Sequence, residues 1–444
     1  MFSQTKLKSL FLLFGDILSF YLALIITLFL RYGNSLTLVS FNKHIWPFSI
    51  IFALWIIIFY ITNLYDLKRA KNEPNFFKTL SVTQIINLST AFAFFYLLPF
   101  FDVSPRTNLL LFTIISTIFL TGWRYFFNRL IKNTRSQNIL IIGLTPEAER
   151  ATHYLGTNPQ LGLNIKSILK NGIDDPLWLS LPKIIEKEQI STLVIAPHIK
   201  KNRRAAKVIF DELTQGIEIL DTSTFYEQIF NKTPLSELEE MWFLENVAHK
   251  RMLYETAKKI MEFFITLTLV IILTPFFIII YFLIKLTSPG RTIYKQIRVG
   301  KKEKIFTLYK FRTMKIDAEK NGPEWSKPND ERITPIGKIL RSSHLDELPQ
   351  LFNVLKGDIS FVGPRPERPE FVKELKEKIP FYEIRHIVKP GITGWAQINY
   401  RYGSSVKDAY EKLQYDIFYI KNRSIILDLL VILKTIKTFF VNQK

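Results

Sequence analysis

The 444-residue chain contains no cysteine, which excludes disulfides, thiolate metal sites and a cysteine nucleophile. Acidic residues are also scarce, because 39 Asp and Glu stand against 59 Lys and Arg, a formal net charge of +20. A balance this basic points to nucleic acid or to a negatively charged membrane surface as a partner. The chain is nevertheless 48% hydrophobic, and long apolar runs alternate with basic clusters. These runs favour the membrane, so we expect a lipid bilayer and no nucleic acid as partner.

Four apolar segments occupy the first third of the chain, at about residues 10–30, 45–64, 80–101 and 107–123. Each approaches the ~20 residues that a helix needs to cross a bilayer. The first segment is long for a signal-peptide core and lacks a clear small-residue cleavage site, so we interpret it as a retained anchor. Asp16 is the one acid within a span, and we expect it near the cytoplasmic interface, with a packing or functional partner as the alternative.

The charges between these segments predict their orientation. On one side lie Lys6, Lys8, Lys68, Arg69, Lys71, Lys78, Arg124, Arg129, Lys132 and Arg135. On the other side lie Arg31, Lys43 and Arg106. The positive-inside rule therefore puts both ends of a four-helix transmembrane unit, residues 1–135, in the cytoplasm.

Residues 136–245 have the pattern of a soluble α/β domain. NILIIG (138–143), STLVIA (191–196) and GIEIL (216–220) are typical of buried parallel strands, and PEAERATHYL (146–155) and RRAAKVIFDEL (203–213) of the helices between them. We predict a Rossmann-like cytoplasmic domain. The chain after the first strand lacks the G-x-G-x-x-G of a dinucleotide site, which favours a docking or dimerisation module over a bound nucleotide.

A fifth apolar run covers residues 263–284 without a charge and is flanked by basic residues on both sides. Pro275 removes the hydrogen bond to the Ile271 carbonyl, and the Thr274 hydroxyl can satisfy a freed carbonyl. We predict a re-entrant helix that breaks at Thr274-Pro275 and returns to the same face, with a kinked spanning helix as the alternative. A last apolar stretch, 424–440, is interrupted by single charges and suits either a helix in the membrane interface or a core helix.

Two adjacent acids, Asp346 and Glu347, stand in the otherwise basic last third of the chain. Pro349 is expected to open a helix that Gly357 closes, which puts both acids ahead of a helix N-terminus, where anions are stabilised. Complementing the helix dipole would explain the acids alone, but four cations are close in sequence: Lys310, Arg312, Arg341 and Arg365, the last within GPRP (363–366). Arginine forks match phosphate oxygens and carboxylates hold Mg²⁺, so the pattern predicts a site for a diphosphate and a divalent metal.

Three longer motifs carry a resemblance to a known family. SPGRTIYKQIRVGKKEKIFTLYKFRTM (288–314), RSSHLDELPQLFNVLKGDISFVGPRPERPE (341–370) and KPGITGWAQINYRYG (389–403) resemble the bacterial polyprenyl-phosphate hexose-1-phosphate transferases of exopolysaccharide biosynthesis, the large monotopic phosphoglycosyltransferases. The resemblance implies a catalytic α/β, mostly helical domain over residues 246–444. It also implies the cytoplasmic face of a bacterial inner membrane, a re-entrant anchor and a homodimer. The helix break of the family is usually Ser-Pro, where this chain has Thr-Pro.

The resemblance also implies a mechanism. Asp346 would attack the sugar-bearing phosphorus of a UDP-sugar, release UMP and form an acyl phosphate, which undecaprenyl phosphate would then accept. An Asp is ionised at pH 7, with a pKa near ~3.9, so no general base is needed and His344 is not assigned that role. The other implied roles are Glu347 for Mg²⁺, Arg365 with Pro364 for the donor phosphate, Arg341 for the lipid phosphate, and Lys310 and Arg312 for phosphate or anionic lipid. Gln397 and Asn399 are candidates for uridine or sugar contacts, or for structural contacts in a turn.

Two other functions fit parts of the chain. A nucleotide-sugar-modifying oxidoreductase or dehydratase built on residues 137–222 would need a glycine-rich cofactor loop, which this sequence lacks. A non-catalytic scaffold of a polysaccharide assembly is disfavoured, because DELPQ and GPRP retain every residue type that the chemistry needs.

Overall fold

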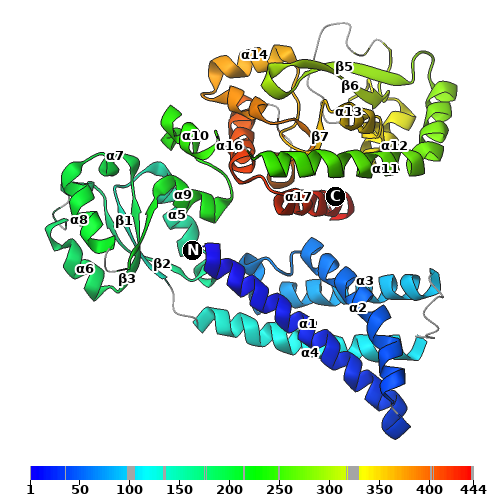
Figure 1. Cartoon of the computed structure of the whole chain (residues 1–444), viewed down its shortest axis with the longest axis horizontal. Coiled ribbons are helices and arrows are strands. Elements are labelled where there is room, and N and C mark those ends of the chain that lie inside the picture. The colour runs from blue at the N-terminus through cyan, green and yellow to red at the C-terminus, as the bar shows by residue number, and fades with distance from the viewer. Residues whose placement is uncertain are drawn as a thin grey trace. The chain divides into compact units, whose positions relative to one another are not determined.

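The computed structural model describes residues 2–35, 37–97, 106–133, 137–174, 176, 178–213, 216–248, 251–316, 318, 330–400, 403 and 405–441. Two predictions lie partly outside these residues. They are the domain boundary at 135 and 136, with Arg135, and the end of the apolar segment 80–101. Two compact units make up the chain, Met1–Ile229 and Phe230–Lys444 (Figure 1). Each unit is described by itself.

Unit 1 begins with four long helices, α1 (Phe2–Tyr32), α2 (Leu38–Ile61), α3 (Pro74–Leu97) and α4 (Arg106–Asn133). In each, a stretch is long and apolar enough to cross a membrane: Lys8–Tyr32, Phe41–Ile61, Pro74–Leu97 and Asn108–Leu130. Aromatic side chains fill the core between the helices, as where Phe52 stacks on Phe20 and on Phe112 with ring centroids 5.1 and 5.5 Å apart. The four apolar segments of the sequence are thus helices of membrane-spanning length and composition.

Asp16 has a partner inside this bundle. Arg124 of α4 donates through Nε to Asp16 Oδ1 at 3.1 Å and through Nη2 to Oδ2 at 2.5 Å, and both side chains are fully buried. Arg124 Nη1 donates to the Leu64 carbonyl beyond the end of α2. Of the two interpretations of Asp16, the structure supports a packing partner, which ties three parts of the bundle together.

The rest of unit 1 is built on a parallel four-stranded sheet with the order β2-β1-β3-β4. Its strands are β1 (Gln137–Ile142), β2 (Leu163–Leu169), β3 (Ile190–Ile195) and β4 (Glu218–Asp221). Its helices are α5 (Pro146–Gly156), α6 (Leu181–Lys187), α7 (Pro197–Lys200), α8 (Arg203–Leu213) and α9 (Thr222–Phe230). The three predicted strands and both predicted helices are confirmed. The edge strand β2 was not predicted, because exposed positions alternate along most of its length and it lacks a buried apolar run.

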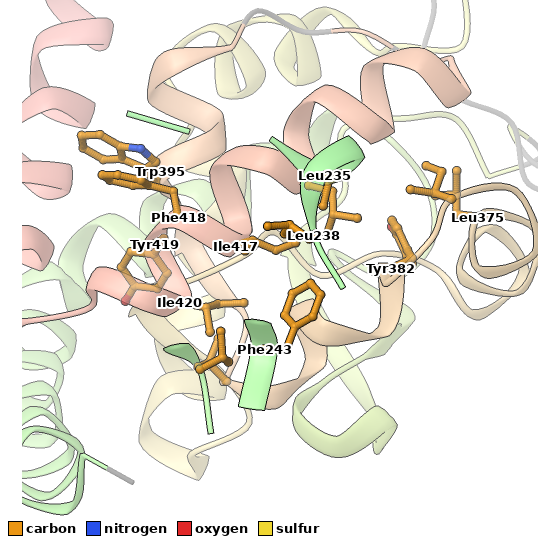
Figure 2. Close-up of a cluster of buried hydrophobic side chains, with 14 of the residues drawn as sticks. Leu235, Leu238, Phe243, Leu375, Tyr382, Trp395, Ile417, Phe418, Tyr419 and Ile420 are labelled. Carbon is orange, nitrogen blue, oxygen red and sulfur yellow. The ribbon is translucent and has the colours of Figure 1, made fainter. Parts of the chain in front are cut away.

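Unit 2 combines helices with two small sheets. Its helices are α10 (Glu240–Asn246), α11 (Met252–Thr287), α12 (Pro335–Ser342), α13 (Gln350–Lys356), α14 (Pro369–Lys378), α15 (Trp395–Asn399), α16 (Val406–Asn422) and α17 (Ile425–Val441). An antiparallel hairpin joins β5 (Ile293–Val299) to β6 (Ile305–Phe311), and β7 (Ser360–Val362) runs parallel to β8 (Gly391–Thr393). The α16 side chains Ile417, Phe418, Tyr419 and Ile420 lie at the centre of the main core (Figure 2).

Residues 230–245 belong to this core. Leu235, Leu238 and Phe243 are buried in the same cluster as the α16 side chains (Figure 2). Lys232 also pairs with Glu411 at 2.6 Å. The segment that the sequence assigned to the preceding domain therefore packs on the last one.

This packing predicts where the last domain can be cut free. A fragment that starts at Phe230 keeps the whole core and should unfold cooperatively, whereas one that starts at Asn246 lacks Leu235, Leu238 and Phe243. Losing one large buried apolar side chain costs about 2–5 kcal/mol, so the shorter fragment should be unfolded or poorly stable. Thermal unfolding of the two fragments in the same detergent measures the difference. Equal melting temperatures would show that residues 230–245 are dispensable.

Helix α11 is 36 residues long and contains Pro275. Figure 1 shows it turning sharply before its C-terminal part. The Thr274 hydroxyl donates to the Val270 carbonyl at 2.7 Å, not to that of Ile271, and such a bond commonly accompanies a bent helix. The stretch is long and apolar enough to span a membrane, and only 11% of it is buried.

Both parts of α11, before and after the bend, contact the rest of unit 2. In the first part, Glu262 accepts a hydrogen bond from the Phe361 main chain at 3.0 Å. In the second part, Ile280 and Ile284 are buried against Phe311 and Leu340. The parts of α11 on either side of the bend are therefore both packed against the other elements of unit 2.

Helix α17 has features of both interpretations of the stretch 424–440: one face is part of the core, and the other is apolar and exposed. Val431 is fully buried in the main core, and Asp428 accepts from the Tyr254 hydroxyl at 2.8 Å. Ile426 on the opposite face is 72% exposed, and Leu429 is exposed as well. The helix is therefore part of the core and also presents an apolar surface to its surroundings.

Candidate active site

Asp346 and Glu347 lie on one short 3-10 turn, Leu345–Glu347, between α12 and α13. His344 leads into the turn in the left-handed region, with φ 55°. Helix α13 follows at once and ends at Gly357, whose φ of 80° favours glycine. The expectation that the acids precede a helix closed by Gly357 is confirmed.

A buried asparagine fixes this helix against the neighbouring hairpin. Asn353 of α13 accepts from the Tyr309 main-chain N–H at 3.1 Å and donates to the Thr307 carbonyl at 2.7 Å. Its side chain therefore replaces a missing strand partner along β6. Lys310, the next residue of β6, thereby reaches the acidic turn.

Glu347 is held by two cations through one oxygen. Its Oε1 accepts from Lys310 Nζ at 2.8 Å and from Arg365 Nη2 at 3.0 Å. Burial favours the neutral acid, but Arg365 and Lys310 together outweigh it and hold the pKa of Glu347 well below its usual range. Burial also lowers the pKa of Lys310, an effect that Glu347 opposes. The geometry keeps Glu347 ionised.

Asp346 differs from its neighbour. Its side chain is buried, and within the described part of the chain its carboxylate takes part in no hydrogen bond or ion pair. Burial raises the pKa of Asp346; Lys310 and Arg341 lower it, and the adjacent Glu347 raises it further. The ordinary pKa expected from the sequence therefore does not apply to this carboxylate.

The other predicted residues lie in different places. Arg341, in the last turn of α12, donates through Nε to the Thr313 hydroxyl at 2.8 Å. Arg312 is buried and donates to the Ser288 carbonyl beyond the end of α11, which is a structural contact. On α15, Gln397 donates weakly to the Ile392 carbonyl at 3.4 Å and Asn399 to the Trp395 carbonyl at 2.8 Å. Both bonds are to residues within five positions in the chain. A contact of Gln397 and Asn399 with uridine or sugar stays a prediction.

Comparison with known proteins gives the family. Residues 253–442 match the family model of the bacterial sugar transferases. Over 338 residues the chain is 32% identical to a UDP-glucose:undecaprenyl-phosphate glucose-1-phosphate transferase of Klebsiella pneumoniae, covering 72% of this chain and 70% of the relative. The chain belongs to the bacterial sugar transferases. This membership makes it an enzyme of the phosphoglycosyltransferase class, as the motifs around Asp346 predict.

Two further relatives match a smaller share of this sugar transferase. A UDP-N-acetylgalactosamine-undecaprenyl-phosphate N-acetylgalactosaminephosphotransferase of Aeromonas hydrophila is 44% identical over 186 residues, 42% of this chain and 44% of the relative. The exopolysaccharide production protein PSS of Rhizobium leguminosarum bv. phaseoli is 39% identical over 185 residues, 40% of this chain and 92% of the relative. The chain thus spans under half the length of the Aeromonas relative.

Glu347 is the residue that would hold Mg²⁺. Mg²⁺ in proteins commonly uses one or two carboxylates and completes its shell with water and substrate phosphates. Glu347 is ionised, and its Oε2 receives no hydrogen bond from the described residues. Among those residues no group of three or more His, Cys, Asp or Glu could enclose a metal. Glu347 would therefore supply one ligand to such a metal, and water and a bound phosphate would have to supply the others.

Sequence reasoning missed Asn353, which holds α13 against β6, and Arg298 and Arg385, which bind carbonyls in the loop of Arg365. Arg385 pairs with Asp416 at 3.0 Å and donates to the Tyr382 hydroxyl. The carbonyls that Arg385 and Arg298 bind lie 20 and 68 positions away in the chain, so no local pattern marks these two residues. The only available signal was the density of charged residues in a segment that also supplies core side chains.

His386, next to Arg385, predicts a pH effect on the stability of the sugar transferase. Burial lowers its pKa from 6.5 to about 4, and Arg385 adds to the shift. The unfolded chain therefore binds a proton below pH 6.5 that the folded chain binds only near pH 4, so stability falls as the pH drops through this window. The full effect is about 3 kcal/mol. Melting curves from pH 7 to pH 4 should show this loss, and His386→Gln should reduce it; an unchanged slope would contradict the assignment.

Proposed function

We propose that this bacterial sugar transferase moves a sugar 1-phosphate from a UDP-sugar to undecaprenyl phosphate and releases UMP. The reaction runs through a covalent aspartyl phosphosugar at the cytoplasmic face of the inner membrane. It forms the first membrane-bound intermediate of an exopolysaccharide, capsule or O-antigen. The observation that carries the proposal is the unequal pairing of two adjacent acids: Glu347 is bound by two cations, whereas Asp346 is buried without such a bond among the described residues.

Each step of the proposed reaction balances without a general base. The Asp346 carboxylate forms a bond to the sugar-bearing phosphorus, the bond from that phosphorus to the UMP oxygen breaks, and UMP leaves as an anion. An oxygen of undecaprenyl phosphate then attacks the same phosphorus, and the Asp346 carboxylate leaves unchanged. Burial raises the pKa of Asp346, and Lys310 and Arg341 oppose this shift and so favour the ionised form that attacks.

The surrounding cations supply the anion-binding groups. Arg365 has a 36% exposed side chain beside Glu347, which suits contact with the donor diphosphate. Arg341 adds a positive charge near Asp346 and is assigned the phosphate of the lipid. Mg²⁺, when bound by Glu347, would neutralise charge on the donor diphosphate, from which UMP leaves. Together these residues compensate the negative charge that two phosphate substrates bring to an acidic pair.

The proposal includes an arrangement in the membrane. Residues 1–135 form a four-helix transmembrane unit followed by a Rossmann-like cytoplasmic domain, and α11 is re-entrant. Contacts of Glu262 and of Ile284 with the rest of unit 2 support this, because a straight helix would hold these two residues ~33 Å apart. A helix that crossed the bilayer of ~30 Å could not keep both contacts.

The decisive experiment is an assay of UMP release. The purified full-length chain in vesicles with undecaprenyl phosphate and Mg²⁺ is given UDP-glucose, UDP-galactose or their N-acetylated relatives, one at a time. Release of UMP with matching sugar-labelled lipid from at least one donor is expected. No release from any donor would favour a non-catalytic scaffold, and a modified but still UDP-bound sugar would favour an oxidoreductase or dehydratase.

A further inference from the structure

The loop that carries Arg365 is held by its main chain. The carbonyls of Val362, Pro364, Arg365, Pro366 and Glu367 all accept hydrogen bonds. Main-chain N–H groups of Gly391 and Val299 bind two of them, at 3.0 Å each. The close approach depends on Gly363, because a Cβ there would lie 2.4 Å from the Lys389 carbonyl oxygen. Two of the other carbonyls are bound by arginine side chains.

Arg385 and Arg298 bind consecutive carbonyls of this loop. Arg385 Nη2 donates to the Arg365 carbonyl at 2.9 Å, and Arg298 Nη1 donates to the Pro366 carbonyl at 2.7 Å. Both guanidiniums are held in turn. Arg385 pairs with the buried Asp416, while both Nε and Nη2 of Arg298 donate to the Gln296 side chain. A fork with several fixed donors can bind a carbonyl and its own support at once, which lysine cannot reproduce.

The main chain of this loop is therefore fixed, while the side chain of Arg365 extends from it. Pro364 and Pro366 fix φ on either side of Arg365. The Arg365 carbonyl is bound by a buried arginine, while its guanidinium reaches Glu347 at 3.0 Å. A rotation of this peptide would move the guanidinium away from the acidic pair.

We propose that Arg385 and Arg298 are positioning residues that act on the reaction through Arg365. By binding the carbonyls of Arg365 and Pro366, the two arginines fix the direction of the Arg365 side chain. The carbonyl oxygens then point toward these two cations, and an anionic substrate meets the Arg365 guanidinium. The inference rests on the proposed function, because it assigns Arg365 to the donor diphosphate. It predicts that Arg385 matters only while Arg365 has its side chain.

A double-mutant cycle tests this coupling. The kcat/KM for UMP release is measured for wild type, Arg385→Lys, Arg365→Ala and the double variant, with the donor on which wild type is active. Arg385→Lys alone should lower kcat/KM by about 10- to 100-fold, since small misplacements of a substrate-binding group have effects of this size. In the Arg365→Ala background the same change should cost less than about threefold, because the coupled side chain is gone.

Arg423→Lys is the matched control. Arg423 is also buried, but it binds the Ile420 carbonyl and lies 3.7 Å from Glu255, outside the loop. Its substitution should cost the same factor with and without Arg365. If Arg385→Lys fails to fold, Arg298→Lys takes its place in the cycle, since that side chain is 16% exposed.

The possible outcomes distinguish failure of the positioning role from failure of the proposed function. Equal losses from Arg385→Lys in both backgrounds, or wild-type activity of a folded Arg385→Lys, would overturn the positioning role and leave the proposed function intact. Absence of UMP release by the wild-type protein with every donor would instead remove the proposed function, and the positioning role with it.

Discussion

Asp346→Asn is expected to abolish transfer and to leave no phosphosugar bound to the protein. The amide keeps the shape of the side chain, but it is no nucleophile toward phosphorus and cannot form the acyl phosphate. With a UDP-sugar labelled in the sugar and no lipid, the wild-type protein should retain label after denaturation, and Asp346→Asn should not. Substantial turnover by the folded Asp346→Asn protein would rule out the covalent mechanism.

Glu347→Gln is the matched control for this result. It removes the other carboxylate of the turn but keeps Asp346, so labelling should continue at a reduced rate. The change also removes the negative charge that Lys310 and Arg365 share, and a buried cation without its counter-charge is destabilising. A lower melting temperature in Glu347→Gln than in Asp346→Asn is therefore expected. Complete loss of label in both variants would mean that the two acids act as a unit.

Straightening α11 is expected to change the topology of unit 2. Replacing Thr274 and Pro275 together by leucine restores an unbroken helix, and its apolar run 263–284 reaches ~33 Å. That length matches a bilayer core of ~30 Å, so the altered helix can span. The basic residues on both sides resist translocation, and a mixed or inverted population should result. Molecules whose catalytic part has crossed lose access to UDP-sugar, so activity should fall in proportion.

Cysteine accessibility measures this topology, because the chain has no native cysteine. Leu253→Cys and Arg291→Cys report the two ends of α11, and both should react only from the cytoplasm in the otherwise unmodified protein. Thr268→Leu is the control, since it makes α11 more apolar without touching the break. An Arg291→Cys that reacts from the periplasm without any change at Pro275 would contradict the re-entrant helix.

The features that the sequence predicts well depend on neighbouring residues. Buried apolar runs predict β1 and β3, and Pro349 with Gly357 predicts the helix behind the acids, because period, proline and glycine act locally. The edge strand β2 lacks such a run, and its place was set by pairing with β1. Local signals predict elements, whereas sheet edges depend on the fold.

The predicted site shows the same division. Asp346 and Glu347 could be picked out because adjacent acids are unusual in a basic segment. Their different states could not, because Glu347 is held by residues 37 and 18 positions away in the chain. The raised pKa of Asp346 comes first from burial, which no residue near it in the sequence reveals. Charge pairing and burial are properties of the assembled fold.

If α11 is re-entrant, as proposed, its bend has a mechanical consequence for the bilayer. A helix that enters and leaves by one face inserts its volume into a single lipid leaflet and adds no area to the other. It therefore acts as a wedge, which increases lateral pressure in the leaflet that contains it. Insertion should be easiest where that leaflet is stretched, as on the outer surface of a small, highly curved vesicle. Binding of unit 2 is thus expected to depend on membrane curvature as well as on lipid charge.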